Sequence, residues 1–411
     1  MAQVSINKRK NMKKDNKIIY FLEDKMKGVS KLILLLAVLL GISRVSFAQG
    51  GETAVPFLLL APDSRAGGIG ESGAGLADNS AAIFWNPAGI AFQSGTELSI
   101  THSNWLPQFK LDLFYDYLTY RQYIPEIDGS ITSSITYMNF GEFIQTGETD
   151  PTEIGRFHSF DAALTLGYAT KLAPDWGLGL NFRLIHSRLS GKIKVGEQLG
   201  EGSATTVSFD IGGMWRPSHL VIPFTDEDLG NRFSIGANLS NIGPKIYYIN
   251  KAQADPIPTN FRLGFAYRIL DDEFNSLTYT LDFSKLMVSK KTNKDEFYKA
   301  IFTSWGDQPL KEELKDVVSS MGLEYVYGQA GDYQFAVRGG YFYEDPSYGN
   351  RKFVTLGAGI RYDMYGFDFS YITTSVFKGG ENHPLSDTLR FTLLIGWGQS
   401  TTQTKGLPRG I

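Results

Sequence analysis

Cysteine is absent from the 411-residue chain, which excludes a disulfide scaffold, thiolate zinc sites and cysteine nucleophiles. Beyond the N-terminal segment there is no apolar run of membrane-helix length. The mean hydropathy of −0.16 excludes a bundle of membrane-spanning helices. Basic residues are scarce after the first 48 positions: those hold 10 Lys and Arg against 3 Asp and Glu, and the rest holds 30 against 40. An acidic surface repels phosphate backbones, so we expect no nucleic-acid binding.

Glycine and aromatic residues are abundant. There are 44 glycines, 28 phenylalanines and 21 tyrosines, and aromatic residues make up 13% of the chain. This combination, with modest hydrophobicity, is typical of many strands that each have one apolar face. The length allows one large barrel or two to three ordinary domains.

Residues 1–48 are predicted to be a secretory signal peptide. A basic stretch that ends at Lys31 precedes the apolar run 32–40, and Ala48 completes a pattern of small residues that signal peptidase recognises. Because the run is too short to span a bilayer, we expect cleavage between Ala48 and Gln49. An uncleaved signal anchor is the alternative.

The starting residue of this signal is open, because its basic part is unusually long. Met12 and Met26 are both possible starts, and a start at Met26 gives an ordinary basic region. The mature chain is expected beyond the inner membrane. No cysteine follows the cleavage point, which excludes a lipoprotein.

From residue 97 onward, side chains alternate in character with period two. In the segment 389–397 one face carries only large apolar side chains: Leu389, Phe391, Leu393, Ile395 and Trp397. Strands of this kind have one apolar face and one polar or small face. The apolar face meets a second sheet in a soluble sandwich, and it meets lipid in an outer-membrane barrel.

The strand candidates number about 14. An even number of strands of about ten residues is what a bacterial transmembrane barrel requires. The candidates are 97–103, 111–121, 129–139, 159–170, 176–187, 205–216, 232–241, 260–268, 277–285, 320–329, 332–341, 352–362, 364–374 and 387–397.

The connections between these strands favour the same architecture. If the first strand runs upward from the periplasm, the outer connections are long: 140–158, 188–204, 242–259 and 286–319. Except for 217–231, the inner connections are short, as at 171–175 and 329–331. Short periplasmic turns and long outer loops are typical of outer-membrane barrels. The predicted fold class is therefore all-β, an antiparallel transmembrane β-barrel over residues 97–397, with a C-terminal tail at 398–411.

Residues 49–96 are predicted to form a plug inside the lumen. They show little alternation and many small residues, and a barrel of about 14 strands can admit a short segment. Glycine suits close turns with positive φ, and Pro87 disfavours a helix through the residue before it. The plug residues that we single out are Pro62, Asp63, Arg65, Gly67, Gly68, Gly70, Asn86, Pro87, Ala88 and Gly89.

Within this segment Gly68, Gly70 and Gly73 spell the dinucleotide-binding pattern GxGxxG. That interpretation needs a preceding strand, a following helix and an acidic residue about twenty positions further on. Pro62 interrupts the approach, and the stretch around Asn86 supplies no acid. We interpret these glycines as turn positions of the plug.

Several segments resemble the PorV/PorQ family of FadL-like outer-membrane barrels. The opening from Ala54 to Gly73 is similar to the start of PorV-type chains, and Phe84–Phe92 contains the Asn-Pro-Ala element of the wider group. Fatty-acid transporters share that element, whereas the combination with later segments is specific to the PorV branch. The later segments begin at Asn241, Arg338, Arg351 and Pro384.

The resemblance covers about residues 54–397, and one departure stands out. Barrels of this kind commonly end on an aromatic residue that the insertion machinery reads. Here Trp397 is followed by a polar tail that ends at Ile411. Either the insertion signal is internal or the tail extends into the periplasm.

The resemblance implies a component of the type IX secretion system in the cell outer membrane. Such a protein binds secreted proteins through their C-terminal signal domains, receives them from the translocon channel and passes them to the surface attachment complex. The alternative is a FadL-like transporter of a hydrophobic small molecule. A transporter needs an apolar pocket beside the plug and an opening in the wall at a strand kink, whereas a shuttle needs a closed lumen and exposed loops.

Enzyme chemistry finds little support, and no cofactor or metal is expected. Glu142, Glu148 and Glu153 in one predicted outer loop indicate a solvated loop, with calcium binding as the alternative. Arg183 and Arg262 are expected to pair with carboxylates or plug carbonyls in the lumen. The histidines lie on different segments without metal-ligand spacing: His102, His158, His186, His219 and His383.

The connection 286–319 is the leading candidate for partner binding, because its periodicity changes from two to near four. Phe297, Ile301 and Trp305 fall on one face of a predicted helix. A second helix is predicted from Pro309, a residue well suited to a first turn. Its apolar stripe could instead pack against the first as a lid over the barrel mouth; this stripe is Leu310, Leu314 and Val317.

Overall fold

The computed structural model describes residues 53–146, 152–195, 198–223, 228–289, 295–329, 331–377 and 384–398. The predicted signal peptide with its cleavage point between Ala48 and Gln49 lies outside these residues, as do Glu148, His383 and nearly all of the tail. Over the described part of the chain, no helix is long and apolar enough to cross a membrane.

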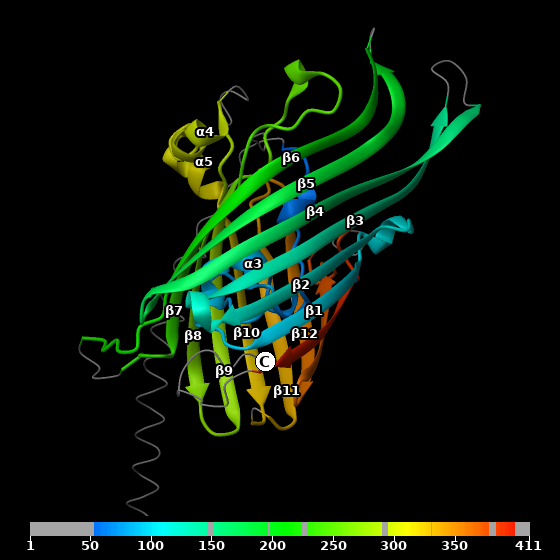
Figure 1. Cartoon of the computed structure of the whole chain (residues 1–411). Coiled ribbons are helices and arrows are strands. Elements are labelled where there is room, and N and C mark those ends of the chain that lie inside the picture. Colours follow the sequence, from blue (N-terminus) through cyan, green and yellow to red (C-terminus); the bar gives the residue numbers. More distant parts are fainter. Residues whose placement is uncertain are drawn as a thin grey trace, which may run out of the picture. The chain divides into compact units, whose positions relative to one another are not determined.

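The described residues form fourteen antiparallel strands that close into one barrel, which confirms the predicted fold class (Figure 1). Each strand pairs with its neighbours along the chain, and β1 closes the barrel by pairing with β14. The strands are β1 (Thr96–Asn104), β2 (Phe114–Ile124), β3 (Gly129–Thr146), β4 (Glu153–Ala173), β5 (Trp176–Val195), β6 (Gln198–Trp215), β7 (Phe233–Ile242), β8 (Asn260–Asp271), β9 (Asn275–Leu286), β10 (Val318–Tyr327), β11 (Gln334–Tyr343), β12 (Lys352–Tyr362), β13 (Tyr365–Thr373) and β14 (Thr388–Trp397).

The two faces of the barrel wall differ as the alternation predicted. On β14, Leu393 and Ile395 are exposed on the outer surface, whereas Arg390 and Thr392 are buried on the lumen side. An apolar outer face and a polar lumen are what a strand in lipid requires. Period two in the sequence therefore gives the side of the wall on which each side chain lies.

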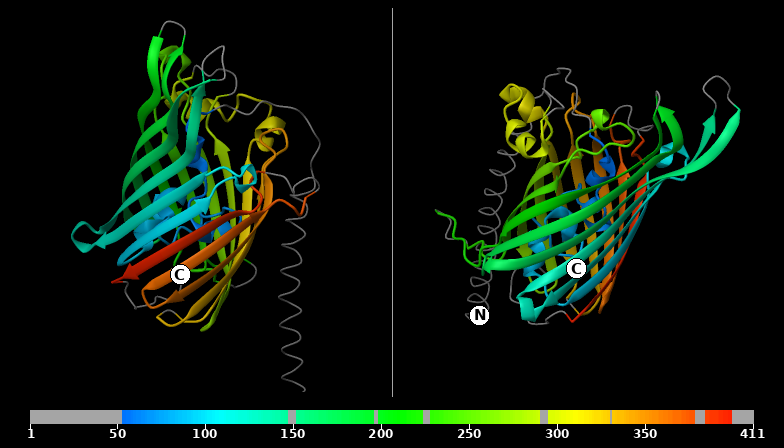
Figure 2. Two further views of the ribbon diagram at one scale, coloured as in Figure 1. Left: turned by 90° about the vertical axis from the view of Figure 1, so that its right-hand side faces the viewer. Right: turned by 45° about the horizontal axis from the view of Figure 1, so that its top comes forward.

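Four strands are much longer than the sequence indicated. β3, β4, β5 and β6 have 18, 21, 20 and 18 residues, and the other described strands have 9 to 12. The ranges 140–158 and 188–204, predicted as outer loops, are therefore largely strand, and that prediction was wrong. Figure 2 shows these strands extending beyond the rest of the barrel at the end that carries α4 and α5, called the upper end here.

A row of aromatic and imidazole rings crosses β1–β5 towards the upper end. Neighbouring rings in it lie with centroids 5.6 to 6.1 Å apart, and His186 Nδ1 lies 2.9 Å from Thr205 Oγ1. Aromatic girdles of this kind lie at the membrane–water interface. The row, called the upper girdle, consists of His102, Phe114, Tyr137, Phe160 and His186.

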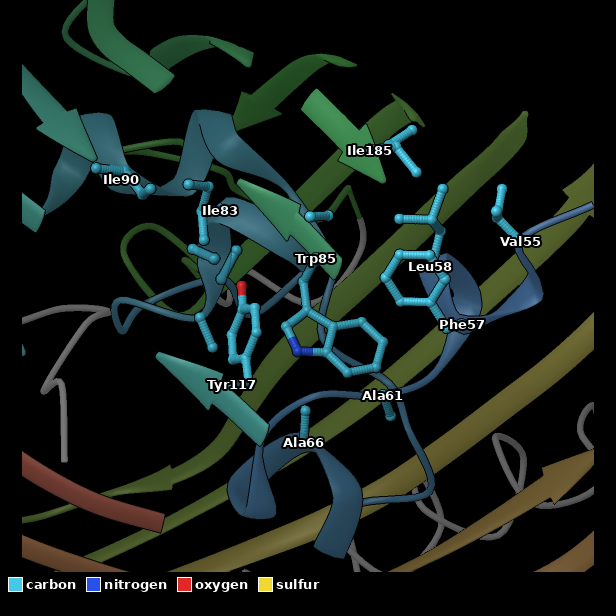
Figure 3. Close-up of a cluster of buried hydrophobic side chains, with 14 of the residues drawn as sticks. Val55, Phe57, Leu58, Ala61, Ala66, Ile83, Trp85, Ile90, Tyr117 and Ile185 are labelled. Carbon is cyan, nitrogen blue, oxygen red and sulfur yellow. The ribbon is translucent and has the colours of Figure 1, made fainter. Parts of the chain in front are cut away.

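The residues before β1 fold into short helical turns against the lumen side of the strands. They are η1 (Pro56–Leu59), α2 (Ser64–Gly68), α3 (Ala82–Trp85) and η2 (Pro87–Phe92). Figure 3 shows Phe57 and Trp85 of this segment buried in one cluster with Tyr117 of β2 and Ile185 of β5. The main apolar cluster of the described chain is thus shared between this segment and the strands.

The remaining short elements lie between strands. The connection between β9 and β10 contains α4 (Phe297–Thr303) and α5 (Leu310–Lys315), so the two predicted helices are present. Single 3₁₀ turns are η3 (Pro107–Phe109), η4 (Pro125–Ile127) and η5 (Lys251–Gln253).

Candidate functional site

The first turn of the lumen segment is built around Asp63. One of its carboxylate oxygens caps α2 by accepting from the Ala66 N–H at 2.9 Å. The other oxygen accepts from the Trp85 indole N–H at 2.6 Å and so joins α2 to α3. Pro62 is buried immediately before this turn. Asp63 therefore sets the fold of the segment itself.

Arg65 connects the segment to the barrel wall. It forms ion pairs with Asp78 of the same segment and with Glu324 of β10, and all three side chains are buried. The arrangement continues along the wall, because Glu324 also accepts from Arg338 of β11 at 2.6 Å. Arg338 in turn contacts Asp368 of β13 at 2.8 Å, and Asp368 pairs with Arg361 of β12.

This run of charges, called the ion ladder, alternates in sign from Asp78 to Arg361. Each member except the two ends lies between two partners of opposite charge. Their attraction offsets the free energy that removing the charges from water costs. A side chain with partners on both sides does not easily leave them for water. The ladder therefore holds α2 against β10–β13.

Three of the predicted plug glycines, Gly67, Gly68 and Gly70, allow the segment to approach the barrel wall closely. Gly70 has φ of 75°, and a Cβ there would lie 2.4 Å from the Met321 carbonyl oxygen, so only glycine fits. Its N–H donates to Thr355 Oγ1 at 2.8 Å. Gly68 lies against Gly357, and Gly67 lies beside the Arg390 side chain.

The Asn-Pro-Ala-Gly motif forms the second contact with the wall. Asn86 caps η2 by accepting from Ala88 N–H at 3.1 Å, and its amide donates to the Gly213 carbonyl of β6 at 3.1 Å. Pro87 begins η2, where its missing N–H costs nothing. A side chain at Gly89 would overlap the Ala77 carbonyl, so close packing selects glycine here as well.

Further hydrogen bonds join the segment to strands all round the barrel. Asp282 of β9 accepts from Gly73 N–H and Ala74 N–H at 2.8 and 2.9 Å. Thr392 of β14 accepts from Ser64 N–H at 3.0 Å and also contacts Thr101 of β1 at 2.7 Å. Since Ser80 N–H donates to Glu97 of β1 at 2.6 Å, the segment contacts both strands of the closing seam.

The two lumen arginines behave as predicted. Arg183 pairs with Asp210 at 2.7 Å. Arg262 lies 3.7 Å from Asp282 and donates to the Glu71 carbonyl at 3.2 Å. Both arginines thus pair with carboxylates of the wall strands, and Arg262 also donates to a carbonyl of the lumen segment.

A narrow cavity lies beside the segment, with room for about one water molecule, and its lining is mixed rather than apolar. Leu58, Leu59 and Phe84 face polar side chains, which include Arg183, Asn238, Asn241, Asn260 and Arg262. One kink of the kind that a lateral opening would need lies in β3, where pairing shifts between Asn139 and Gly141, and another lies in β6, between Phe209 and Ile211. Phe140, the extra residue in β3, packs against the main apolar cluster and fills the kink in that strand.

The predicted partner-binding residues at the upper end separate into two groups. Phe297 and Ile301 are half-buried, whereas Trp305 is exposed and lies just beyond α4 with its ring 5.6 Å from that of Phe261. The exposed stripe of the helix is instead Tyr298, Phe302 and Trp305, in which Phe302 is 78% exposed. Phe297 and Ile301 thus share one half-buried face of α4, and Trp305 remains exposed beyond its end.

The lid alternative is also wrong. Leu310 and Leu314 of α5 are exposed, so they do not pack against the predicted stripe of Phe297, Ile301 and Trp305. The two helices therefore present apolar side chains on the upper surface of the barrel.

The described part of the chain contains no group of three or more His, Asp and Glu that could hold a metal ion. Two exposed histidines pair with carboxylates: His102 with Asp116 at 2.7 Å and His219 with Asp228 at 3.1 Å. Glu142 and Glu153 both contact Arg156, at 3.1 and 2.7 Å. These carboxylates are thus engaged in a surface ion pair.

The family model described as type IX secretion system protein PorV matches residues 48–293, more than half of the chain. The chain belongs to the PorV family. This confirms the resemblance based on the opening segment and the Asn-Pro-Ala motif. PorV-family membership, together with the closed barrel of fourteen strands, places the protein in the outer membrane as a secretion component.

Other comparisons add structural relatives. Comparison with curated proteins gives no match. Among solved structures, the Pseudomonas putida toluene transporter TodX is 10% identical and has a TM-score of 0.45, with 85% of this chain and 97% of that chain covered. A Pseudomonas aeruginosa FadL homologue is 11% identical with a TM-score of 0.44, covering 82% and 97%. The Ralstonia pickettii toluene transporter TbuX is 12% identical with a TM-score of 0.41, covering 81% and 97%.

Sequence reasoning missed most of the ion ladder. Asp78, Glu324, Arg338 and Asp368 are all buried on the lumen side. The available signal was a charge at an inward position of an alternating strand, as with Glu324 between the exposed Leu323 and Tyr325. The partner of such a charge is not visible in the sequence.

Proposed function

We propose that this PorV-family protein captures secreted proteins at the cell surface by their C-terminal signal domains. It receives them from the translocon channel and passes them to the surface attachment complex. Two observations support the proposal: the segment before β1 makes buried contacts with inward-facing residues of the strands, and apolar side chains are exposed at the upper end. Such a protein can bind a partner on its upper surface, whereas its lumen leaves no open channel.

The occupied lumen supports a shuttle over a channel. We propose that the residues from about 55 to 95 act as a plug. Arg65 and Asn86 tie this segment to the wall through buried contacts, and Phe140 fills the kink in β3. Release of the plug would break the buried ion pair between Arg65 and Glu324, which is costly.

The exposed apolar stripe supports partner binding at the upper end. Soluble surfaces rarely gather large apolar side chains without an interaction role, and aromatic residues are the usual energetic anchors of interfaces. Tyr298, Phe302 and Trp305 form such a stripe on α4 and just after it. In this proposal Phe297 and Ile301, the other predicted residues, hold the helix on the rim.

The competing function is transport of a hydrophobic small molecule. A transporter needs an apolar site beside the lumen segment, and the cavity at this place is narrow. The arginine and asparagine side chains in its lining favour a polar occupant instead.

Binding of a purified C-terminal signal domain from a secreted protein tests the proposal. The wild-type barrel and the double variant Phe302→Ala/Trp305→Ala would be compared in detergent, with Tyr333→Ala as the matched control at the opposite end. Loss of two aromatic anchors should weaken binding by about 2 kcal/mol or more, roughly thirtyfold. The control should bind normally, and all barrels should stay heat-resistant on gels.

The outcome separates the two functions. No binding of the signal domain to the wild-type barrel, together with uptake of a hydrophobic compound into cells that produce it, would favour the transporter. Full binding by an intact double variant would keep the shuttle but place its docking surface elsewhere.

A further inference from the structure

The connection between β9 and β10 folds against the outer side of the barrel wall. Asp282 of β9 bonds to the lumen segment, so Phe283 beside it faces outward, and Lys285 shares the side of Phe283. Lys285 pairs in register with Phe261 of β8, whose ring lies 5.6 Å from that of Trp305. Figures 1 and 2 show α4 and α5 at the margin of the upper end.

Lys285 places a charge on the side of the wall that faces lipid. Leu277, the first outward apolar residue of β9, lies eight positions before it, about 27 Å along the strand and roughly 20 Å along the membrane normal for a tilt of about 40°. The apolar band of such a barrel is about 25 Å tall, so Lys285 lies near its upper border. A lysine on this side needs partners of opposite charge or an exit to water.

α5 supplies these partners and is thereby fixed to the wall. The ammonium group of Lys285 lies 2.8 Å from Glu313 Oε2 and 2.6 Å from Asp316 Oδ2, and both Lys285 and Glu313 are buried. The hydroxyl of Ser304, just after α4, donates to Met287 Sδ at 3.4 Å, and both residues are buried. The connection is therefore attached at the upper end of β9 at two places.

The rest of α5 divides into an apolar and a charged flank. Successive residues are turned by about 100° around a helix, so with Glu313 on the wall, Leu310 and Leu314 both fall to one side of it. Glu312 falls to the other side. Leu310 and Leu314, called the apolar flank, are 75% and 66% exposed. Two large apolar side chains thus lie beside the contact with Lys285 without cover from the described part of the chain.

The charged flank faces the connections of the upper end. The Tyr348 hydroxyl, in the connection between β11 and β12, donates to Gln308 Oε1 at 2.8 Å, two residues before α5. Burial raises the pKa of Tyr348 to about 12, and the nearby carboxylates of Asp316 and Glu312 add to the shift. The side of α5 that carries Glu312 is thus turned to the solvated end of the barrel, and the apolar flank is turned away from it.

We propose that the apolar flank of α5 lies on the acyl chains at the border of the upper leaflet. Amphipathic helices with an apolar and a charged side lie in the plane of the membrane interface. The flank continues the lipid-facing surface of the barrel, because α5 is seated on Lys285, the next outward residue after Phe283. The ligand is therefore membrane lipid, recognised through its hydrocarbon, and Lys285 is the positioning residue. The inference does not depend on the proposed function.

Quenching by brominated lipid tests this inference on the full barrel. Leu314→Cys carries a fluorophore, and the barrel is reconstituted in phosphatidylcholine vesicles with or without bromine on the sixth and seventh carbons of the acyl chains. Bromine should reduce the emission of this label at least twofold. The matched control is Glu312→Cys on the charged flank of the same helix, whose label should respond to aqueous iodide and not to bromine. Heat resistance on gels confirms that both barrels are intact.

The other outcomes contradict the inference. Quenching of the Leu314→Cys label by iodide alone means that the flank faces water and is free for a protein partner, which overturns lipid as its occupant. Equal quenching of both labels by bromine overturns the orientation assigned to α5.

A second comparison tests the role of Lys285. In Lys285→Ala, Glu313 and Asp316 lose their common partner, so the difference in bromine quenching between the two labels should fall at least twofold. Lys285→Arg keeps the charge and should keep the difference. An unchanged difference in an intact Lys285→Ala barrel would show that Lys285 does not position the helix.

Discussion

Arg65 contacts Glu324 through two parallel hydrogen bonds, from Nε to Oε2 at 2.8 Å and from Nη2 to Oε1 at 2.7 Å. The two residues are 259 positions apart, one in the lumen segment and one in the middle of the wall. Paired hydrogen bonds fix both distance and orientation, unlike a single contact. The segment before β1 is therefore held in a defined position against β10.

Removal of Glu324 should destabilise the barrel. In Glu324→Ala, both Arg65 and Arg338 lose a buried carboxylate, and breaking a buried ion pair costs about 3 to 5 kcal/mol. The expected result is a lower denaturation midpoint, measured by the gel shift between folded and unfolded barrel. Glu126→Ala, at an exposed acid, is the control. An unchanged midpoint for Glu324→Ala would contradict a role of the ion ladder in stability.

Deletion of residues 55–95 should open the lumen to ions. The wild-type barrel is expected to show near-zero conductance in planar bilayers, because the segment occupies the lumen. The deleted form should show discrete single-channel steps. If a correctly folded deletion barrel still does not conduct, the segment is not what closes the lumen.

Labelling should place the upper end at the cell surface. The chain has no cysteine, so single introduced cysteines react without background. Phe302→Cys should react with an impermeant maleimide on intact cells. Tyr333→Cys, exposed in the turn between β10 and β11, should react only after permeabilisation. Reversed labelling would invert the orientation and remove the upper end from the cell surface.

The lower turn 217–231 should depend on the charge of Asp228. Hydrogen bonds from the backbone N–H groups of Leu220 and Gly230, with His219 beside them, lower the pKa of Asp228 to about 2. A lowered pKa means that stabilisation is complete above the ordinary aspartate value and is lost as the pH falls through about 2. The turn should thus keep its conformation at pH 4 and loosen below it.

A fluorophore on Val221→Cys, exposed in that turn, reports this change through collisional quenching between pH 5 and 2. The same label combined with Asp228→Asn should give quenching that does not change over that range. A transition centred at the ordinary aspartate value would mean that the two hydrogen bonds are absent in solution.

The wall of the barrel could be predicted because lipid imposes a regular pattern on it. Residues 389–397 alternate visibly, and the structure places their apolar members outward. The upper parts of β3–β6 escaped prediction because no lipid requires alternation there: Ile144 and Ile154 are outward, yet Glu142 and Arg156 share their side. Backbone pairing continues where the side-chain pattern has stopped.

Two other features depend on contacts that a single sequence does not encode visibly. Arg65 and Glu324 could each be recognised as polar residues in apolar surroundings, but not as partners. On α4 both Phe297/Ile301 and Tyr298/Phe302 are apolar pairs at helical spacing. Ala300 and Ser304 are buried on the inner side of the helix and decide which pair is exposed.

The hydroxyl of Thr392 has a consequence for how the protein is made. It accepts from Ser64 N–H in the lumen segment and touches Thr101 of β1, while its own strand is the last to be synthesised. Thr392 therefore takes part both in the pairing of the first and last strands and in the binding of the lumen segment. A barrel that closed empty would lack the bond from Ser64 to Thr392, and the segment would have to enter a closed barrel afterwards. We therefore expect the N-terminal segment to reach its place before, or together with, formation of the final strand pair, because Thr392 contacts both Ser64 and Thr101.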